Sequence, residues 1–268
     1  MSPRPSTSSS TTAATSRASP ATEHSTGRMK RILGIGCLAG LAAGAAAALF
    51  AATAGRGPIR DAIALEDSIS HGTSGAHHDD LFSRGVQEIG GAIGLIVFGL
   101  ALGVIFAVVL AAVGPRLVAS TPLTASIRLG FFGFVAVVLV PFLKYPANPP
   151  AVGDPDTVNE RTVLYFAVLG LSILLTWAVW RFHLGVSLSP VAKAWATAAL
   201  YGAGLLVIFL ALPGNPDAID APADLVWRFR LASLGGLAAA WATLALVTGT
   251  LLSRPGRAGE SSGTQAPA

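Results

Sequence analysis

Three of the five histidines in this sequence lie within one stretch of eight residues, beside paired carboxylates. Neutral imidazole combined with carboxylate suits borderline divalent ions such as cobalt, nickel, zinc and copper. Glycines between the histidines would let a loop wrap a cation without helical spacing. The pattern predicts a metal-capturing loop whose ligands are Glu66, His71, His77, His78 and Asp79. A solvated polar loop with incidental histidines explains the spacing equally well, so both interpretations stay open at this point.

The chain that carries this loop is too apolar to present a water-soluble surface. Of its 268 residues, 52% are hydrophobic and 12% are charged, and the mean hydropathy is +0.62, whereas soluble proteins are about 25% charged. Since about 20 helical residues cross a hydrocarbon core of about 30 Å, six long charge-free segments predict an all-α integral membrane protein, a bundle of about six transmembrane helices. The spans are expected at about residues 32–55, 89–113, 124–145, 162–180, 194–212 and 231–252.

The third span is the least regular of the six. Its charge-free part covers only residues 129–143, and we expect Arg128 and Lys144 to extend it by reaching their charged ends toward the membrane surface. Pro141 lies near one end and is expected to kink the helix, because proline removes a backbone donor.

Basic residues gather at the connections on one side of the membrane. The two tails and the connections at residues 113–128 and 181–193 hold 11 Lys or Arg and 2 Asp or Glu, against 7 and 12 in the three opposite connections. Because cytoplasmic connections carry the excess of positive charge, both termini are expected in the cytoplasm and the histidine-rich loop outside. The sequence pI of about 9.7 then reflects topology, and no nucleic acid partner is expected.

The composition divides the chain into a membrane domain, residues 29–253, and two tails. Residues 1–28 and 254–268 are poor in large apolar side chains, so both are expected to be disordered cytoplasmic tails. Met29 precedes two basic residues and resembles a translation start, which leaves open whether residues 1–28 are translated. A cleaved signal peptide is the alternative for the first span, but its apolar run exceeds the usual 7 to 15 residues.

Within the spans, small residues recur at the spacing of one helical turn, which predicts close helix packing. The pairs are Gly40 and Gly44, Gly90 and Gly94, and Gly99 and Gly103. No charged residue or histidine falls in the middle of a span, so neither a proton relay nor a haem site is predicted. The sequence also lacks a P-loop and an HExxH motif. We therefore expect no catalytic residue, no enzyme activity and no tightly bound cofactor.

Two proline-rich connections resemble each other. Residues 146–155 align without a gap to residues 213–222, and the same offset places Arg161 on Arg228. One hypothesis is that the hairpin of spans three and four repeats as spans five and six in the same orientation, as in some transporters. Convergent proline-rich loop composition is the alternative.

Several motifs stand in order around the spans. They are residues 58–66, residues 83–87, residues 143–153 and residues 228–235. In these motifs the chain resembles the bacterial cobalt transporter subunit CbtA family, over about residues 29–252. The resemblance implies a multi-pass protein of the bacterial cytoplasmic (inner) membrane that imports cobalt for cobalamin biosynthesis. It also implies a small single-span, histidine-containing partner subunit of the CbtB type.

Loop chemistry and resemblance together predict a membrane subunit of a cobalt, or other divalent transition-metal, importer, with the cobalt ion as transported cargo. Carboxylates of the proline-rich connections are candidates for a vestibule: Asp154, Asp156, Asp217, Asp220 and Asp224. An uncharged interior is a poor path for a divalent ion, so passage is expected to use backbone carbonyls, Ser172, Thr176 and Thr243, or a partner or homo-oligomer. The alternative is a non-transporting scaffold or assembly protein whose outer loops bind a partner protein.

Overall fold

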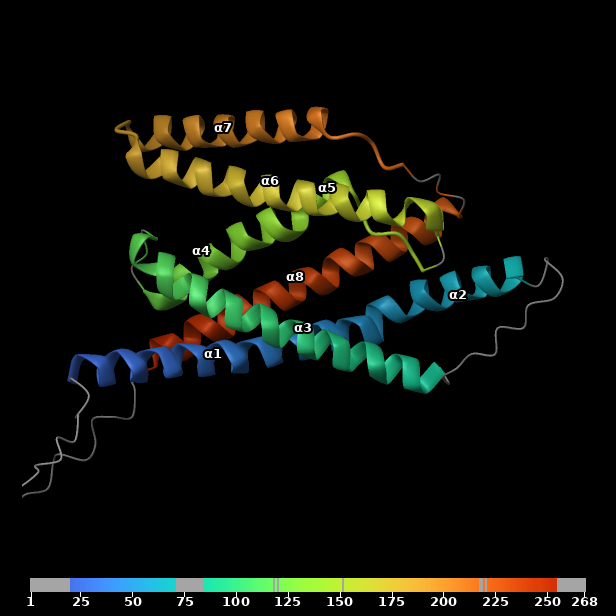
Figure 1. Ribbon diagram of the computed structural model, residues 1–268, viewed down its shortest axis with the longest axis horizontal. Coiled ribbons are helices and arrows are strands. Elements are labelled where there is room, and N and C mark those ends of the chain that lie inside the picture. Colours follow the sequence, from blue (N-terminus) through green and yellow to red (C-terminus); the bar gives the residue numbers. More distant parts are fainter. Residues whose placement is uncertain are drawn as a thin grey trace, which may run out of the picture.

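The computed structural model describes residues 20–70, 84–117, 119, 121–150, 152–216, 219 and 221–254, without the side chains of residues 20–26, 66–70, 84 and 155. Within this part of the chain the structure contains helices and no strands, as Figure 1 shows. Six of the helical segments are long and apolar enough to cross a membrane. They are Gly27–Leu65, Gly85–Arg116, Pro122–Lys144, Val158–Gly185, Pro190–Ala211 and Ala223–Ser253. The predicted all-α membrane fold is confirmed.

The long helices are joined by short helical pieces. In chain order they are α1 (Pro20–Phe50), the π-helical η1 (Ala51–Gly55), α2 (Arg56–Ser70), α3 (Arg84–Val113), the 3-10 helix η2 (Gly114–Arg116), α4 (Pro122–Phe134), the π-helical η3 (Val135–Leu139), α5 (Val140–Lys144), the 3-10 helix η4 (Pro155–Thr157), α6 (Val158–Gly185), α7 (Pro190–Ala211) and α8 (Ala223–Ser253).

The two ends of the bundle differ in charge. We call the end at which α2, α5 and α7 finish and α3, α6 and α8 begin the acidic end. The opposite end, with the start of α1, the α3–α4 and α6–α7 connections and the end of α8, is the basic end. This grouping follows from the helix order, because successive long helices run in opposite directions (Figure 1).

The first helix is longer than the first predicted span at both ends. It begins at Pro20, inside the segment expected to be disordered, and proline is well tolerated at the first position of a helix. It continues through η1 into α2, where a loop was expected from Arg56 onward. The reason is that α2 is amphipathic: its apolar face includes Pro58 and Ala62, which are buried, and α2 packs against α8.

Each π-helical segment ends two or three residues before a proline. Pro58 follows η1 and Pro141 follows η3. A proline has no N–H to donate to the carbonyl four residues earlier, and a π turn is one way for the backbone to absorb that lost bond. At η3 the Val140 N–H donates to the Val135 carbonyl, the five-residue step of a π turn. The structure thus has a local change of helix type before Pro141, and the third span continues from Pro122 to Lys144. The kink expected there stays a prediction.

Glycine lets α1 and α3 touch backbone to backbone. A Cβ atom added to Gly103 would lie 2.2 Å from the Gly36 carbonyl oxygen, and one added to Gly99 would lie 2.6 Å from that of Gly40. Gly44 similarly meets the backbone of Ile96. Two of the three predicted glycine pairs therefore pack these helices together. The third pair, Gly90 and Gly94, has no described atom within 4 Å of its added Cβ positions.

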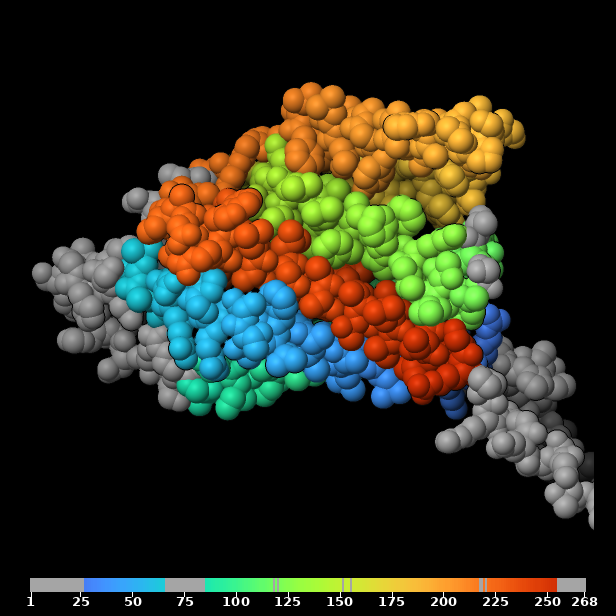
Figure 2. All heavy atoms as spheres, turned by 180° about the vertical axis from the view of Figure 1, so that it is seen from behind, coloured from blue at the N-terminus to red at the C-terminus, as the bar shows by residue number. Residues whose placement is uncertain are grey.

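Helix α8 lies at the centre of the packed group. It runs between α1 on one side and α4 on the other, as the sphere view in Figure 2 shows. Trp241 of α8 is buried and makes an edge contact with Phe106 of α3, with ring centroids 6.4 Å apart. The Ser126 hydroxyl of α4 donates to the Ala245 carbonyl of α8 at 2.7 Å. Packing and hydrogen bonding together fix α1, α3, α4 and α8 as one unit.

Helices α6 and α7 form a hairpin along one edge of the molecule (Figure 1). A small cluster of Val140, Val168 and Ile208 joins this hairpin to the third span. Ile208 is the only buried residue of α7. Side chains such as Trp195 and Leu210 are exposed on this helix and would face lipid in a membrane.

The packing of the hairpins does not support an internal repeat. The third span packs against α6 through α5 and η3, whereas α7 and α8, the corresponding pair, make hardly any contact with each other in the described residues. The repeat remains a prediction from the sequence of the two loops.

Candidate functional site

One of the five predicted metal ligands falls within the described residues. Glu66 is on the last turns of α2, with only its backbone described. The other four, His71, His77, His78 and Asp79, fall outside the described residues. Among the described side chains, no group of three or more His, Cys, Asp or Glu is placed to hold a metal ion. The prediction of this ligand set therefore stays a prediction.

Three of the five vestibule candidates are described, and each is exposed. The Asp154 carboxylate accepts a hydrogen bond from the Asp156 backbone N–H at 2.9 Å, and its carbonyl accepts one from the Thr157 hydroxyl at 2.8 Å, which shapes the start of α6. Asp224 forms an ion pair with Arg228 at 2.9 Å. Asp217 and Asp220 lie outside the described residues.

Two ion pairs join helices at the acidic end. Arg228 of α8 contacts Asp61 of α2 at 2.9 Å, and Arg56 contacts Glu88 of α3 at 2.8 Å. All four side chains are about half exposed, so each pair contributes only about 0.2–1 kcal/mol. Their main effect is to hold α2 beside α8 and α3. The sequence shows that these charged residues are present, but it does not indicate which acidic residue pairs with which arginine.

Hydrogen bonds join the residues that lead into the two proline-rich loops. The Lys144 ammonium donates to the carbonyls of Phe209 and Leu212 at 2.9 and 2.8 Å, where α7 ends. A cation is favourable there, because the last carbonyls of a helix carry partial negative charge. The Tyr145 hydroxyl donates to the Pro213 carbonyl at 2.8 Å. Burial, and secondarily the charge of Glu160, raises the pKa of Tyr145, so this group remains a neutral donor.

Arg230 completes this assembly from α8. Its guanidinium donates to the Ala147 carbonyl at 3.2 Å and to the Asn148 side-chain oxygen at 2.9 Å. The loop that begins at Tyr145 is therefore held by α8 on one side and by the end of α7 on the other. Sequence reasoning assigned Lys144 to the membrane surface and gave Arg230 no role. In the structure both side chains donate to backbone carbonyls at the acidic end. A pattern of residue types does not indicate which carbonyls a side chain will reach.

A cavity of about 330 Å³ opens between the proline-rich loops and reaches Trp241. Its lining is mainly apolar and aromatic, with polar groups from Asn148, Asn215 and Arg161 near the loops. No described Asp, Glu or His lines it. A cationic guanidinium and neutral amides are weak partners for a divalent ion, so the described lining of this cavity does not form a cation site.

A second cavity, of about 430 Å³, opens at the basic end. Leu102 and Trp241 line the first cavity, while Leu110 and Thr248 line the second. The buried ring of Phe106, packed edge-on against Trp241, lies between these levels on α3. The two cavities thus approach each other from opposite ends of the bundle and are separated by a packed aromatic layer.

Two of the three hydroxyl groups suggested for passage donate hydrogen bonds to helix carbonyls, and their part in passage stays a prediction. Ser172 is buried and donates to the Ala136 carbonyl of the neighbouring helix. Thr176 donates to the Ser172 carbonyl at 2.8 Å. Neither these two residues nor Thr243 lines either cavity.

Six apolar helices joined by short charged connections define a multi-pass helical membrane protein. A family model described as "Probable cobalt transporter subunit (CbtA)" matches residues 29–253. The chain therefore belongs to the CbtA family, as its motifs indicated, and the description as a subunit implies at least one partner. Neither the curated proteins nor the solved structures contain a match to this chain.

Proposed function

We propose that this chain is the membrane subunit of a cobalt importer in the bacterial cytoplasmic membrane, with the acidic end outside and both termini in the cytoplasm. The family supports the cargo. The excess of basic residues at the opposite end supports the orientation. A cysteine-reactive, membrane-impermeant label tests the orientation: in a Cys37→Ser background, Ser74→Cys should react in intact cells, and protection of that thiol until lysis would overturn the topology.

Capture of the cation is assigned to Glu66, His71, His77, His78 and Asp79. The observation that supports this assignment is a contrast: the described side chains include no cluster of three or more His, Cys, Asp or Glu, whereas the sequence that follows α2 is rich in histidine and carboxylate. Exposed carboxylates nearby, with Asp154, Asp156 and Asp224 among them, add negative potential that raises the local concentration of a cation. With Asp217 and Asp220 they would form the rim of a vestibule.

The triple substitution of His71, His77 and His78 by Ala tests the capture site. Removal of three imidazoles should raise the apparent KM for cobalt uptake by roughly tenfold or more, because even supporting groups of metal ligands are worth 10–100-fold in affinity. Radioactive cobalt accumulation at limiting supply measures it. His24→Ala, outside residues 29–253, is the matched control and should leave uptake unchanged. Equal uptake by the triple variant at equal protein level would remove the loop from the mechanism.

The partner is proposed to be a small single-span protein that contains histidine. The apolar interior gives a divalent ion few ligands of its own, and no described carboxylate lines the acidic-end cavity, so a second chain would supply ligands. Uptake into vesicles with this chain alone should be much slower than with both chains. If cobalt uptake in cells is unaffected when this chain is deleted, the protein is instead a non-transporting scaffold or assembly factor.

A further inference from the structure

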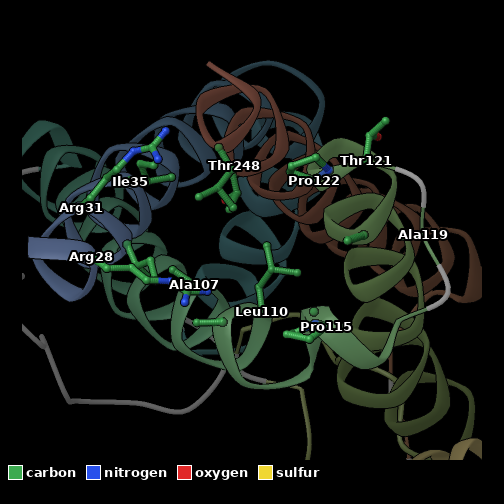
Figure 3. Close-up of a pocket in the computed structure, with 15 residues that line it drawn as sticks. Arg28, Arg31, Ile35, Ala107, Leu110, Pro115, Ala119, Thr121, Pro122 and Thr248 are labelled. Carbon is green, nitrogen blue, oxygen red and sulfur yellow. The ribbon is translucent and has the colours of Figure 1, made fainter. Parts of the chain in front are cut away.

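The cavity at the basic end combines an aliphatic lining with charged side chains, as a binding site for an amphiphile does. It lies between α1, α3, α4 and α8, with Leu110 and Thr248 between the arginines of α1 and the start of α4 (Figure 3). Its volume of about 430 Å³ is within the range of small-molecule sites, about 300–1,000 Å³. Most of its lining is aliphatic, including Ile35, Leu110 and Leu252. Such a lining fits a hydrocarbon chain.

The mouth of this cavity carries fixed positive charge. Arg28 and Arg31 line it and are one helical turn apart on α1, so they lie on the same face of that helix. The Arg31 guanidinium donates one hydrogen bond to the Arg254 carbonyl at 2.8 Å, which ties α1 to the end of α8 and leaves its other N–H groups available. No described Asp or Glu lines the cavity. The mouth therefore favours an anion.

Thr248 is an independent sign of a polar ligand atom. This side chain is 0% exposed and lines the cavity, yet its hydroxyl has no hydrogen-bond partner among the described residues. Thr250, on the same helix, satisfies its hydroxyl by donating to the Leu246 carbonyl at 2.8 Å. A buried polar group without a partner is unfavourable. A ligand that placed an oxygen beside Thr248 would remove this penalty.

We propose that this cavity binds an anionic phospholipid from the membrane leaflet at the basic end. The phosphate would lie at Arg28 and Arg31, one acyl chain would occupy the aliphatic part, and an ester oxygen would meet the Thr248 hydroxyl. Thr248 lies six residues before Arg254 on α8, about 9 Å deeper along the helix axis, as ester groups lie deeper than phosphate. Basic pockets between membrane helices recognise anionic headgroups in this way.

The helices that surround the cavity are packed unequally against one another. Although α3 and α4 follow each other in the chain, they pack against each other only slightly, whereas α1 with α3 and α4 with α8 form extensive interfaces. The cavity lies where these two pairs diverge. A lipid fits this arrangement better than a free phosphate ion or a nucleotide, because neither of those would use the aliphatic lining.

Lipid binding to the full-length chain in detergent tests the proposal, with native mass spectrometry as the readout. The wild-type protein should bind phosphatidylglycerol roughly tenfold to thirtyfold more tightly than phosphatidylcholine of the same acyl chains, from about a fivefold contribution by each arginine. Arg28→Gln with Arg31→Gln should abolish this preference. Lys30→Gln is the matched control, since Lys30 is exposed in the same turn of α1 but does not line the cavity. It should retain the preference.

A second variant separates the acyl chain from the charge. Ala111→Leu places extra volume in the cavity while both arginines remain, and it should weaken binding of both lipids severalfold. If the double arginine variant is not produced, Arg28→Gln alone should still reduce the preference about fivefold. No test here involves metal, so the result is independent of the proposed transport.

Several outcomes would overturn the proposal. These are equal binding of the two lipids by the wild type, an equal loss in Lys30→Gln, or displacement of the lipid by millimolar inorganic phosphate, which would assign the mouth to a free anion. A lipid preference that emerges only when residues 1–19 are deleted, or only when a dimer dissociates, would assign the cavity to the chain's own tail or to a second copy.

Discussion

The helices α1, α3, α4 and α8 and the α6–α7 hairpin are all apolar enough to cross a membrane, but they are packed in different ways. In the first group, glycine brings backbones into contact and a buried tryptophan fills the space between helices. In the hairpin, α7 buries a single residue and most of its large side chains are exposed. The comparison shows that apolar character determines which segments can lie in a membrane. Side-chain size determines which of these segments pack closely against another helix.

The reason lies in the solvent. Lipid tails are as apolar as leucine, so a large apolar side chain gains little by moving from lipid to a helix interface, whereas small residues gain close dispersion contacts. Gly36, Gly40, Gly99 and Gly103 provide such contacts between α1 and α3. Helix α7 lacks a comparable interface within the described residues, and its exposed side chains fit a surface covered by lipid or by a partner subunit.

Substitution of one tryptophan in each region is expected to give the largest difference in the free energy of unfolding. Trp241→Ala should lower the free energy of unfolding by about 3–5 kcal/mol, because it leaves a large cavity beside Phe106. Trp241 is 7% exposed and Trp195 of α7 is 73% exposed. Trp195→Ala should therefore change the free energy of unfolding by less than about 0.5 kcal/mol. Unfolding of the purified proteins by denaturing detergent measures both. Similar losses would show that α7 is packed against something in the native protein.

Glycine substitutions give the next contrast. Gly103→Ala places a Cβ atom 2.2 Å from the Gly36 carbonyl oxygen and 2.5 Å from the Gly40 Cα atom. Both neighbours are backbone, so the helices must separate, and we expect a loss of about 3 kcal/mol, the upper part of the usual range for overpacking. In Gly202→Ala on α7 the new atom meets nothing within 4 Å. That control should be neutral or slightly stabilising in the same unfolding assay, since Ala has the higher helix propensity.

An unaffected Gly103→Ala protein would contradict the close α1–α3 contact. A destabilised Gly202→Ala protein would point to a helix seated on α7 in the assembled protein. The two substitutions add the same single methyl group to glycines within apolar helices, so a difference between them reports helix contact alone.

The fold could be predicted further than the site. The six spans follow from sequence because the hydrocarbon thickness fixes the length of a charge-free helix. The glycine pairs indicated close packing but not the partner: Gly40 and Gly44 face α3, while Gly90 and Gly94 face no described atom. Helix α2 was missed because its charges outweighed its apolar pattern, although Ile59, Ala62 and Ile63 already showed helical spacing.

The candidate site depends more on tertiary contacts, which sequence reasoning does not supply. Residue types predicted the capture loop, whose histidines lie outside the described residues. They did not predict that Arg228 joins Asp61 from 167 positions away, or that Lys144 holds the end of α7. Both contacts depend on where helix packing places α8 and α7. A local sequence pattern does not determine these positions.

Hydrogen bonds between helices give the smallest expected contrast. Ser126 is buried and donates to the Ala245 carbonyl of α8 at 2.7 Å, while the Thr197 hydroxyl of α7 lies 3.0 Å from His183 of α6 and is only partly buried. Ser126→Ala should lower the free energy of unfolding by about 1 kcal/mol, within the range measured for hydrogen bonds between membrane helices.

Thr197→Val keeps the shape of the side chain and should cost less than about 0.5 kcal/mol, because the freed His183 nitrogen reaches water at the basic end. The same unfolding assay compares the two variants. If Thr197→Val proved the more damaging, hydrogen bonding would be holding the hairpin together in place of the glycine contacts that hold α1 to α3. The distinction between the two regions would then be one of interaction type and no longer one of packing strength.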